Sequence, residues 1–146
     1  MKGIITMDHG SGCGRSSELI DKLFLKYFSS TLLADQSDSA VLAIPVENIA
    51  FTTDSYVIRP IFFPGGDIGK LAVCGTVNDL AVSGALPKYI SCAFILEEGL
   101  DLGELERVVI SMADTARASG VRIVTGDTKG VEKGSCDKLF INTSGI

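Results

Sequence analysis

The stretch FFPGGDIGKLAVCGTVNDLAVSGA, residues 62–85, decides the fold. Its turn residues PGGD lead into a run of apolar residues, and Asp67 is suited to the first turn of a helix. We predict that the helix continues to about Ser83, because Gly84 and Pro87 then end it. Apolar residues surround this helix on nearly every side, which indicates burial against a sheet.

Two polar residues, Asn78 and Asp79, interrupt the apolar pattern. Burial of a lone ionised carboxylate would be costly. The neighbouring residues Ile68, Ala72 and Gly75 are small or apolar, so they are expected to leave a groove for another group. A cation beside Asp79, with Asn78 hydrogen-bonding nearby, would offset the cost. The alternative is a structural carboxylate that is capped or satisfied by water.

The glycine loop before the helix is not a Walker A loop. Gly65 and Gly69 enclose three residues, and Leu71 follows Lys70, whereas that motif needs four residues and then Ser or Thr. Two interpretations stay open. The helix N-terminus binds an anion, or the loop is only a turn.

The rest of the chain reads as strands and helices in alternation. Helices are predicted from about Glu18 to Phe28, capped by Ser16 or Ser17, and from about Leu102 to Ser119. Strands are predicted at residues 39–44, 49–58, 88–96, 121–129 and 138–146, with the first two and the last two forming pairs. This order predicts an α+β fold with a largely antiparallel sheet.

Composition excludes several classes of protein. The chain has 146 residues, 46% of them hydrophobic, and a net charge of −5, which disfavours nonspecific nucleic-acid binding. Four dispersed cysteines and one histidine argue against a zinc site or a disulfide framework, and favour reduced cytosolic thiols. No apolar run is long enough for a membrane span, so we expect a cytoplasmic protein. An apolar strand at the C-terminus suggests a fragment that continues elsewhere, although a terminal strand is also compatible with a complete protein.

Further acidic residues are candidates to join Asp79. Asp54 and Asp127 are predicted at strand ends, and Asp38 just before a strand. Carboxylates beside turns can hold Mg²⁺, although each aspartate alone is more typical of a turn residue. In TGDTKG, Thr128 could bind phosphate, and Lys129 could neutralise charge or move a proton. The alternative there is a polar hairpin arm.

Two residues of the N-terminal stretch MDHGSGCGRSS are also candidates. His9 would contact substrate or, more simply, be a flexible surface histidine. Cys13 lies in a glycine-rich loop, where a thiol can be reactive.

The motifs DHGSG, FTTDSYVI, FFPGGDIGKLAVCGTVNDLAVSGA and VTGDTK together resemble the N-terminal domain of the hydrogenase maturation factor HypE. That family belongs to the superfamily of aminoimidazole ribonucleotide synthetase, PurM, and selenophosphate synthetase. The resemblance runs through nearly all of residues 1–146. It implies an ATP-binding and dimerisation domain, in which the sheets of a homodimer join into a barrel. It also implies that a C-terminal domain with a terminal cysteine tail is absent.

The resemblance implies a role for each candidate residue. Mg²⁺ on ATP would be held by Asp54, Asp79 and Asp127, with help from Asp38. Further positions around the nucleotide would be Lys70, Asn78, Gly126, Thr128 and Lys129. Lys129 would assist proton transfer, and His9 would help to close the site.

The family reaction is an ATP-dependent dehydration of a cysteine-bound carbamoyl group to a thiocyanate. Its cyano group goes to the iron of [NiFe]-hydrogenase. Implied partners are the carbamoyltransferase HypF and the HypC–HypD iron-scaffold complex.

Three departures qualify the resemblance: Arg59 stands where the family usually has an acidic residue, Cys13 replaces a glycine, and Cys136 does not match the thiol carrier. A selenophosphate synthetase that uses Cys13 therefore stays open, as does a non-catalytic dimerisation or maturation-partner module.

Overall fold

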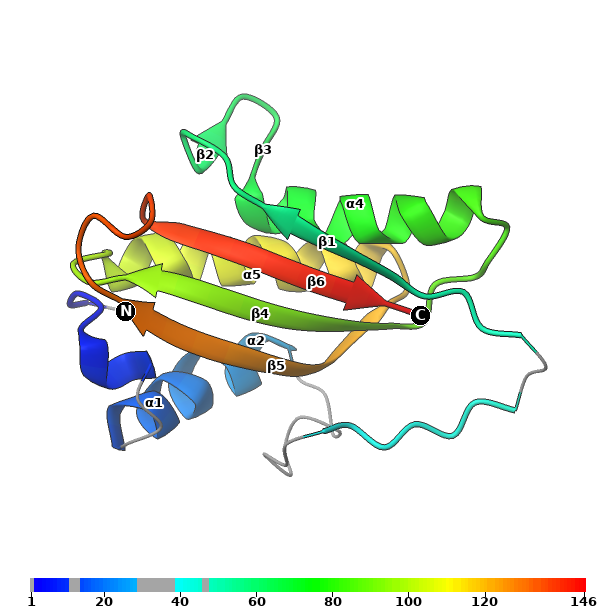
Figure 1. Cartoon of the computed structure of the whole chain (residues 1–146), viewed down its shortest axis with the longest axis horizontal. Helices are drawn as coiled ribbons and strands as arrows, with labels where there is room; N and C mark the ends of the chain where they lie inside the picture. Colours follow the sequence, from blue (N-terminus) through cyan, green and yellow to red (C-terminus); the bar gives the residue numbers. More distant parts are fainter. Residues whose placement is uncertain (1, 11–13, 29–38, 46–47) are drawn as a thin grey trace.

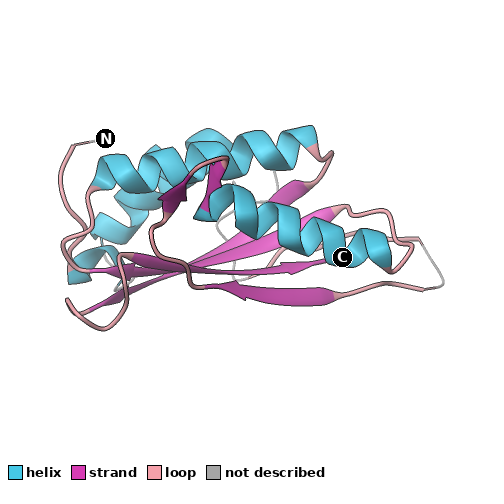
Figure 2. Cartoon of the chain, turned by 90° about the horizontal axis from the view of Figure 1, so that it is seen from above, coloured by secondary structure: helices cyan, strands magenta, loops and turns pink. Residues whose placement is uncertain are grey.

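The computed structural model describes residues 2–10, 14–28, 39–45 and 48–146. Its main feature is a four-stranded sheet with helices on one face (Figure 1; Figure 2). The strands, in spatial order, are β1 (Thr52–Tyr56), β6 (Leu139–Gly145), β4 (Tyr89–Glu97) and β5 (Arg122–Val131). The pairs β1–β6 and β4–β6 are antiparallel and β4–β5 is parallel. The predicted α+β class with a largely antiparallel sheet is confirmed.

The helical segments are η1 (Met7–Gly10), α1 (Gly14–Leu19), η2 (Ile20–Leu25), α2 (Lys26–Phe28), α4 (Ile68–Val82) and α5 (Leu102–Ala118). A short hairpin of β2 (Phe62–Phe63) and β3 (Gly66–Asp67) precedes α4. The core lies between the helices and one face of the sheet. On β4, for example, Ile90, Phe94 and Leu96 point toward the helices and are buried.

The two long helices begin and end close to the predicted residues, because their caps are encoded locally. The Asp67 carboxylate accepts hydrogen bonds from the backbone N–H groups of Gly69 and Lys70, at 2.7 and 3.1 Å. Asp101 caps α5 in the same way. Such caps satisfy N–H groups that have no partner inside the helix.

The N-terminal helix was predicted to start too late. It begins at Gly14, and Ser16 is a buried residue inside it rather than its cap. The Ser16 hydroxyl donates to the carbonyl oxygens of His9 and Asp8, at 2.8 and 3.1 Å. The Ser16 side chain therefore makes a tertiary contact with η1 instead of capping the helix as the local pattern predicted.

Two predicted strand pairings are wrong. Strands β5 and β6 are joined by a short loop but do not pair, because β4 lies between them. Residues 39–44, predicted as a strand, form no regular element. They are extended and apolar, with Val41 86% exposed. No backbone bond between this segment and β1 is formed, so the predicted hairpin with residues 49–58 does not exist.

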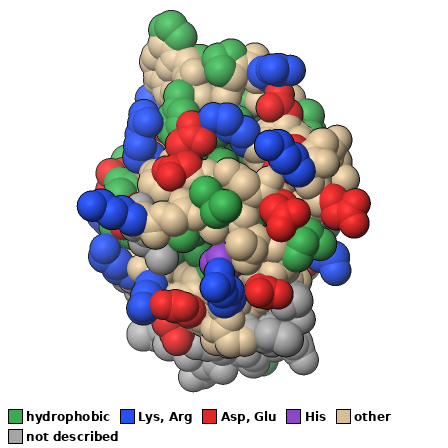
Figure 3. Space-filling model, turned by 90° about the vertical axis from the view of Figure 1, so that its left-hand side faces the viewer, with side chains coloured by type: hydrophobic (Ala, Val, Ile, Leu, Met, Phe, Trp, Pro, Cys, Tyr) green, Lys and Arg blue, Asp and Glu red, His purple; other side chains and the backbone are tan. Residues whose placement is uncertain are grey.

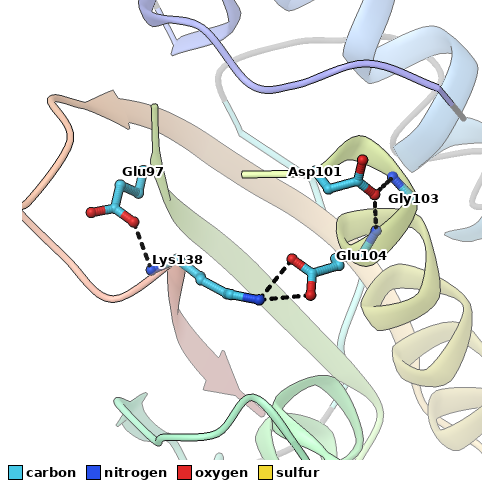
Figure 4. Close-up of polar contacts among 5 residues, drawn as sticks. All are labelled: Glu97, Asp101, Gly103, Glu104 and Lys138. Atoms are coloured by element: carbon cyan, nitrogen blue, oxygen red, sulfur yellow. Dashed lines mark hydrogen bonds and ion pairs between the residues drawn. The ribbon is translucent and has the colours of Figure 1, made fainter. Parts of the chain in front are cut away.

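The β5–β6 loop is held by charged side chains from β4 and α5 (Figure 4). Glu97 accepts hydrogen bonds from the backbone N–H groups of Gly134 and Lys138, at 2.7 and 3.1 Å. The Lys138 ammonium donates to both carboxylate oxygens of Glu104, at 2.6 and 2.9 Å. These contacts fix the loop that carries the chain past β4 to β6.

The charged surface has no dominant sign at the end of the molecule drawn in Figure 3, where acidic and basic side chains are interspersed. Among the described residues, none of the helices has the length and apolar character needed to traverse a bilayer.

Candidate functional site

The structure brings two predicted acidic residues together where β1 lies along α4. Asp54 lies inside β1 rather than at a strand end, and its carboxylate accepts a hydrogen bond from the Tyr56 hydroxyl at 2.9 Å. Asp79, on α4, accepts one from the Thr52 hydroxyl at 3.1 Å. Thr52, Asp54 and Tyr56 alternate along the strand and so face the same side. We call Asp54 and Asp79 the acidic pair.

The premise that Asp79 is buried is wrong. Asp79 and Asn78 are both exposed, because α4 packs on the sheet and α5 along only part of its circumference. The expected groove is also absent from this part of the described chain. Ile68 and Ala72 are fully buried, and the space beside Gly75 is filled by the Tyr56 hydroxyl, 2.1 Å from where a Cβ would lie.

Beneath the acidic pair lies a buried polar network that the sequence interpretation missed. Thr76 and Thr143 are 0% exposed, and their hydroxyl oxygens are 2.6 Å apart. The Thr143 hydroxyl donates to the Ala72 carbonyl at 3.3 Å, so Thr76 is the donor within the pair. Tyr56 completes the network. Period-two alternation in TTDSY was the available signal, because it places Tyr56 and Asp54 on one face.

Tyr56 is 8% exposed and stays protonated well above neutral pH. Burial raises the pKa of Tyr56 from 10.0 to about 12, and the hydrogen bond to Asp54 acts in the same direction, against smaller opposing contributions from Thr76 and Thr143. At neutral pH the phenol is therefore a hydrogen-bond donor to the carboxylate.

This raised pKa predicts an alkaline loss of stability. Below pH 10 the stabilisation from the protonated phenol is fully present. Between about pH 10 and pH 12 the unfolded chain releases its Tyr56 proton while the native chain keeps it, so the free energy of unfolding falls as pH rises. Urea unfolding across this range should give a shallower decline for Tyr56→Phe than for the wild-type chain. Parallel declines would contradict the assignment.

The second group of predicted residues lies on β5, at the opposite edge of the sheet. Asp127 and Lys129 are exposed, Thr128 is half-buried, and Asp127 pairs in register with Ala93. Ala93 points away from the helices, so Asp127 lies on the face that they leave open. Like Asp54, Asp127 is inside a strand rather than at its end.

Within one chain the two acidic groups do not meet. Strands β6 and β4 separate β1 from β5, a distance of about 14 Å at ordinary strand spacing. Among the described residues, no three His, Cys, Asp or Glu side chains are grouped as metal ligands. Asp38 lies outside the described residues. The chemistry of the acidic pair nevertheless suits Mg²⁺, which prefers carboxylate oxygens and retains several waters.

His9 is buried rather than flexible, contrary to the prediction. It is 8% exposed, and its Nδ1 accepts a hydrogen bond from the Thr6 backbone N–H at 3.0 Å. This bond assigns the ring proton to Nε2 in the neutral form. The next residue, Gly10, lies against β5: a Cβ there would be 1.8 Å from the Gly130 nitrogen. The fold therefore places His9 near the Lys129 end of β5.

Lys70 lies at the far end of α4 from Asn78, about 12 Å away along the helix. Its ammonium donates to the Gly65 carbonyl at 3.1 Å. Of the two interpretations of the glycine loop, the turn is confirmed. The Asp67 carboxylate occupies the N–H groups that an anion would need.

Three residues depart from the HypE pattern, and the structure describes two of them, Arg59 and Cys136. Arg59 is 85% exposed in its side chain and forms a surface ion pair with Asp137 at 3.2 Å. Burial, together with Glu97 and Asp137, raises the pKa of the Cys136 thiol. Cys13, on which the selenophosphate alternative depends, lies outside the described residues.

Comparison with known proteins gives one consistent result. The family model described as AIR synthase related protein, N-terminal domain, matches residues 36–146. Carbamoyl dehydratase HypE of Escherichia coli (strain K12) is 57% identical over 147 residues, which cover 97% of this chain and 44% of that protein. The chain thus spans less than half the length of this relative.

Two solved structures show the same likeness. HypE in complex with ATP matches with a TM-score of 0.93 and 57% identity, over 95% of this chain and 41% of that one. The HypE–HypF complex matches with a TM-score of 0.67 and 53% identity, over 87% of this chain and 41% of that one.

Proposed function

Because the chain belongs to the family of AIR synthase related proteins and resembles HypE over nearly all its length, we propose that it is the magnesium–ATP-binding N-terminal domain of a HypE-type carbamoyl dehydratase. The observation that carries the proposal is the acidic pair between β1 and α4. The likeness to a HypE structure solved with ATP supports the nucleotide as ligand. Residues 1–146 would form the ATP-binding and dimerisation domain of a longer protein.

Asp54 and Asp79 would be the central magnesium ligands. Each carboxylate has one hydrogen-bond donor among the described side chains, which leaves oxygen lone pairs for a metal ion. Two exposed or half-exposed carboxylates also explain how an acidic chain binds a triphosphate, since the cation neutralises both partners. Asn78, the exposed neighbour of Asp79, would contact the nucleotide. Lys70 would contact a part of the ligand remote from Asn78.

A homodimer would complete the site. Strands β1 and β5 are the two edges of the sheet. We infer a two-fold axis that runs along the barrel, which sets the β1 edge of one copy beside the β5 edge of the other. Gly126 and Thr128 would then lie beside the acidic pair of the second copy, and one metal–nucleotide complex would reach around this strand edge to Asp127, which lies on the other face of β5.

Exposed apolar side chains beside the acidic pair support this interface. Phe51 is 69% exposed and immediately precedes Thr52, and Val82 is 86% exposed one helical turn after Asp79. Leu86, 73% exposed, follows the same helix. Apolar surface of this kind marks a contact with another protein surface.

Bound ATP would supply a phosphoryl group to the oxygen of a cysteine-bound carbamoyl group. Loss of this oxygen as phosphate, together with the two N–H protons, would leave a thiocyanate. Lys129 would assist the proton transfer from β5. His9 would line the same region and, with Nδ1 occupied by Thr6, offer the Nε2 proton as a hydrogen-bond donor. Cys92 is excluded as the carrier thiol because it is 2% exposed.

The implied partners follow from the same likeness. HypF would deliver the carbamoyl group, which the HypE–HypF complex supports. The HypC–HypD complex would receive the cyano ligand for iron. We place this activity in the cytoplasm, where ATP is available.

Calorimetric titration with magnesium and the ATP analogue AMPPNP tests the proposal. Asp79→Ala is expected to weaken binding about tenfold or more, because one charge-assisted contact is worth about 1.5–3 kcal/mol. Asp114→Ala is the matched control, since it removes an exposed carboxylate whose ion pair among the described residues is with Arg117 on α5. Equal AMPPNP affinities of the wild type and Asp79→Ala would show that Asp79 is not part of the nucleotide site.

A further inference from the structure

We propose that Tyr56 is a positioning residue that holds the Asp54 carboxylate in the orientation required for metal binding. This inference rests on the proposed function, because it presupposes that Asp54 is a magnesium ligand. It assigns a role to a buried side chain that need not touch metal or nucleotide.

The first support is the way in which the Tyr56 ring is held. Tyr56 is 8% exposed and lies between β1 and α4. A Cβ at Gly75 would lie 2.1 Å from the phenol oxygen and 3.0 Å from the carbon that bears it. Only glycine at that helix position leaves room for the hydroxyl. The ring therefore packs directly against Gly75, and from this position its hydroxyl donates to Asp54 Oδ2 at 2.9 Å.

The second support is the network behind the ring. The Thr76 and Thr143 hydroxyls are 2.6 Å apart, and Thr143 also donates to the Ala72 carbonyl at 3.3 Å. Thr143 is the partner of Asp54 in the β1–β6 register. The Tyr56 ring beside Asp54 is thus packed against β6 and α4 as well as β1, while the hydrogen bond to the carboxylate itself comes from Tyr56 on the same strand.

A carboxylate held in this way is suited to metal binding. The tyrosine hydroxyl occupies Oδ2 and leaves Oδ1 available. Hydrogen bonds to a ligating carboxylate fix its rotamer, and removing such a partner commonly costs 10–100-fold in metal affinity. A tyrosine that only filled the core would have no such effect, and its removal would lower stability alone.

The test is a titration of the purified chain with Mn²⁺ alone, because AMPPNP would itself chelate the ion, with free Mn²⁺ followed by electron paramagnetic resonance. Tyr56→Phe keeps the ring and removes the hydroxyl, so the Mn²⁺ Kd should rise about tenfold. Gly75→Ala keeps the hydroxyl but displaces it and should raise the Kd similarly. Tyr27→Phe is the matched control, because it removes a comparable 2.8 Å bond to Glu106, remote from the acidic pair. It should leave the Kd unchanged.

Asp54→Asn separates failure of this inference from failure of the proposed function. If Asp54→Asn loses Mn²⁺ and Tyr56→Phe binds it as the wild type does, Tyr56 is only structural and the inference is overturned. If Asp54→Asn binds Mn²⁺ with the wild-type Kd, or if the wild type binds no Mn²⁺, the proposed metal site itself is wrong. The positioning role of Tyr56 is then wrong as well. Circular dichroism confirms that each variant is folded.

Discussion

Replacing Gly69 with alanine is expected to lower the melting temperature of the chain by about 5–10 °C. Gly69 is buried at the start of α4, where α5 crosses. A Cβ there would lie 2.5 Å from the Val108 carbonyl oxygen and 2.7 Å from Met112 Cγ. The backbone oxygen cannot move aside without moving α5, so the two helices must separate. Such overpacking costs about 2–3 kcal/mol, and each kcal/mol shifts a domain of this size by about 2–4 °C.

Gly14→Ala is the control for this prediction. Gly14 is also helical, but nothing lies within 4 Å of the position of its Cβ. Thermal unfolding followed by circular dichroism should therefore show little change for Gly14→Ala. Equal melting temperatures for Gly69→Ala and the wild type would show that α4 and α5 do not cross as closely as described.

Mixing two inactive variants is expected to restore nucleotide binding if the site is shared between two copies. Asp79→Ala disables the group on α4, and Asp127→Asn disables the group on β5. In a mixed dimer, one site carries both changes and the other carries neither. Random assortment makes half of the dimers mixed, so binding capacity should recover to about a quarter of the wild-type value.

The control mixture combines Asp79→Ala with Asp54→Asn. Both changes fall in the acidic pair, so each site of the mixed dimer carries one of them and no capacity returns. AMPPNP-binding stoichiometry with magnesium measures both mixtures, after co-refolding to exchange copies. Absence of recovery in the first mixture, with dimers present by light scattering, would mean that a single chain supplies all the acidic groups or that Asp127 has another role.

The two long helices could be predicted from the sequence because their capping and apolar signals are local. Asp67 begins α4, and the apolar stripe that includes Leu105 and Met112 defines α5. Strand order could not be predicted in the same way. Nothing in residues 121–146 indicates that β4 inserts between β5 and β6, because that position depends on pairing with a strand earlier in the chain.

The candidate site was predicted in its residue types but not in its geometry. The unusual positions of Asn78 and Asp79 drew attention to α4, yet the reason given, burial of the carboxylate, was wrong. Apolar composition cannot distinguish a helix buried within one chain from a helix that exposes some apolar side chains. Val82, 86% exposed, is such a residue. Tyr56 was missed because its role depends on the space that Gly75 leaves on another element.

The most direct test of the account is a crystal structure of this chain with magnesium and AMPPNP. The account predicts a metal ion about 2.0–2.1 Å from carboxylate oxygens of both Asp54 and Asp79, bridging to the triphosphate. A well-ordered nucleotide bound elsewhere, with both carboxylates free of metal, would contradict it.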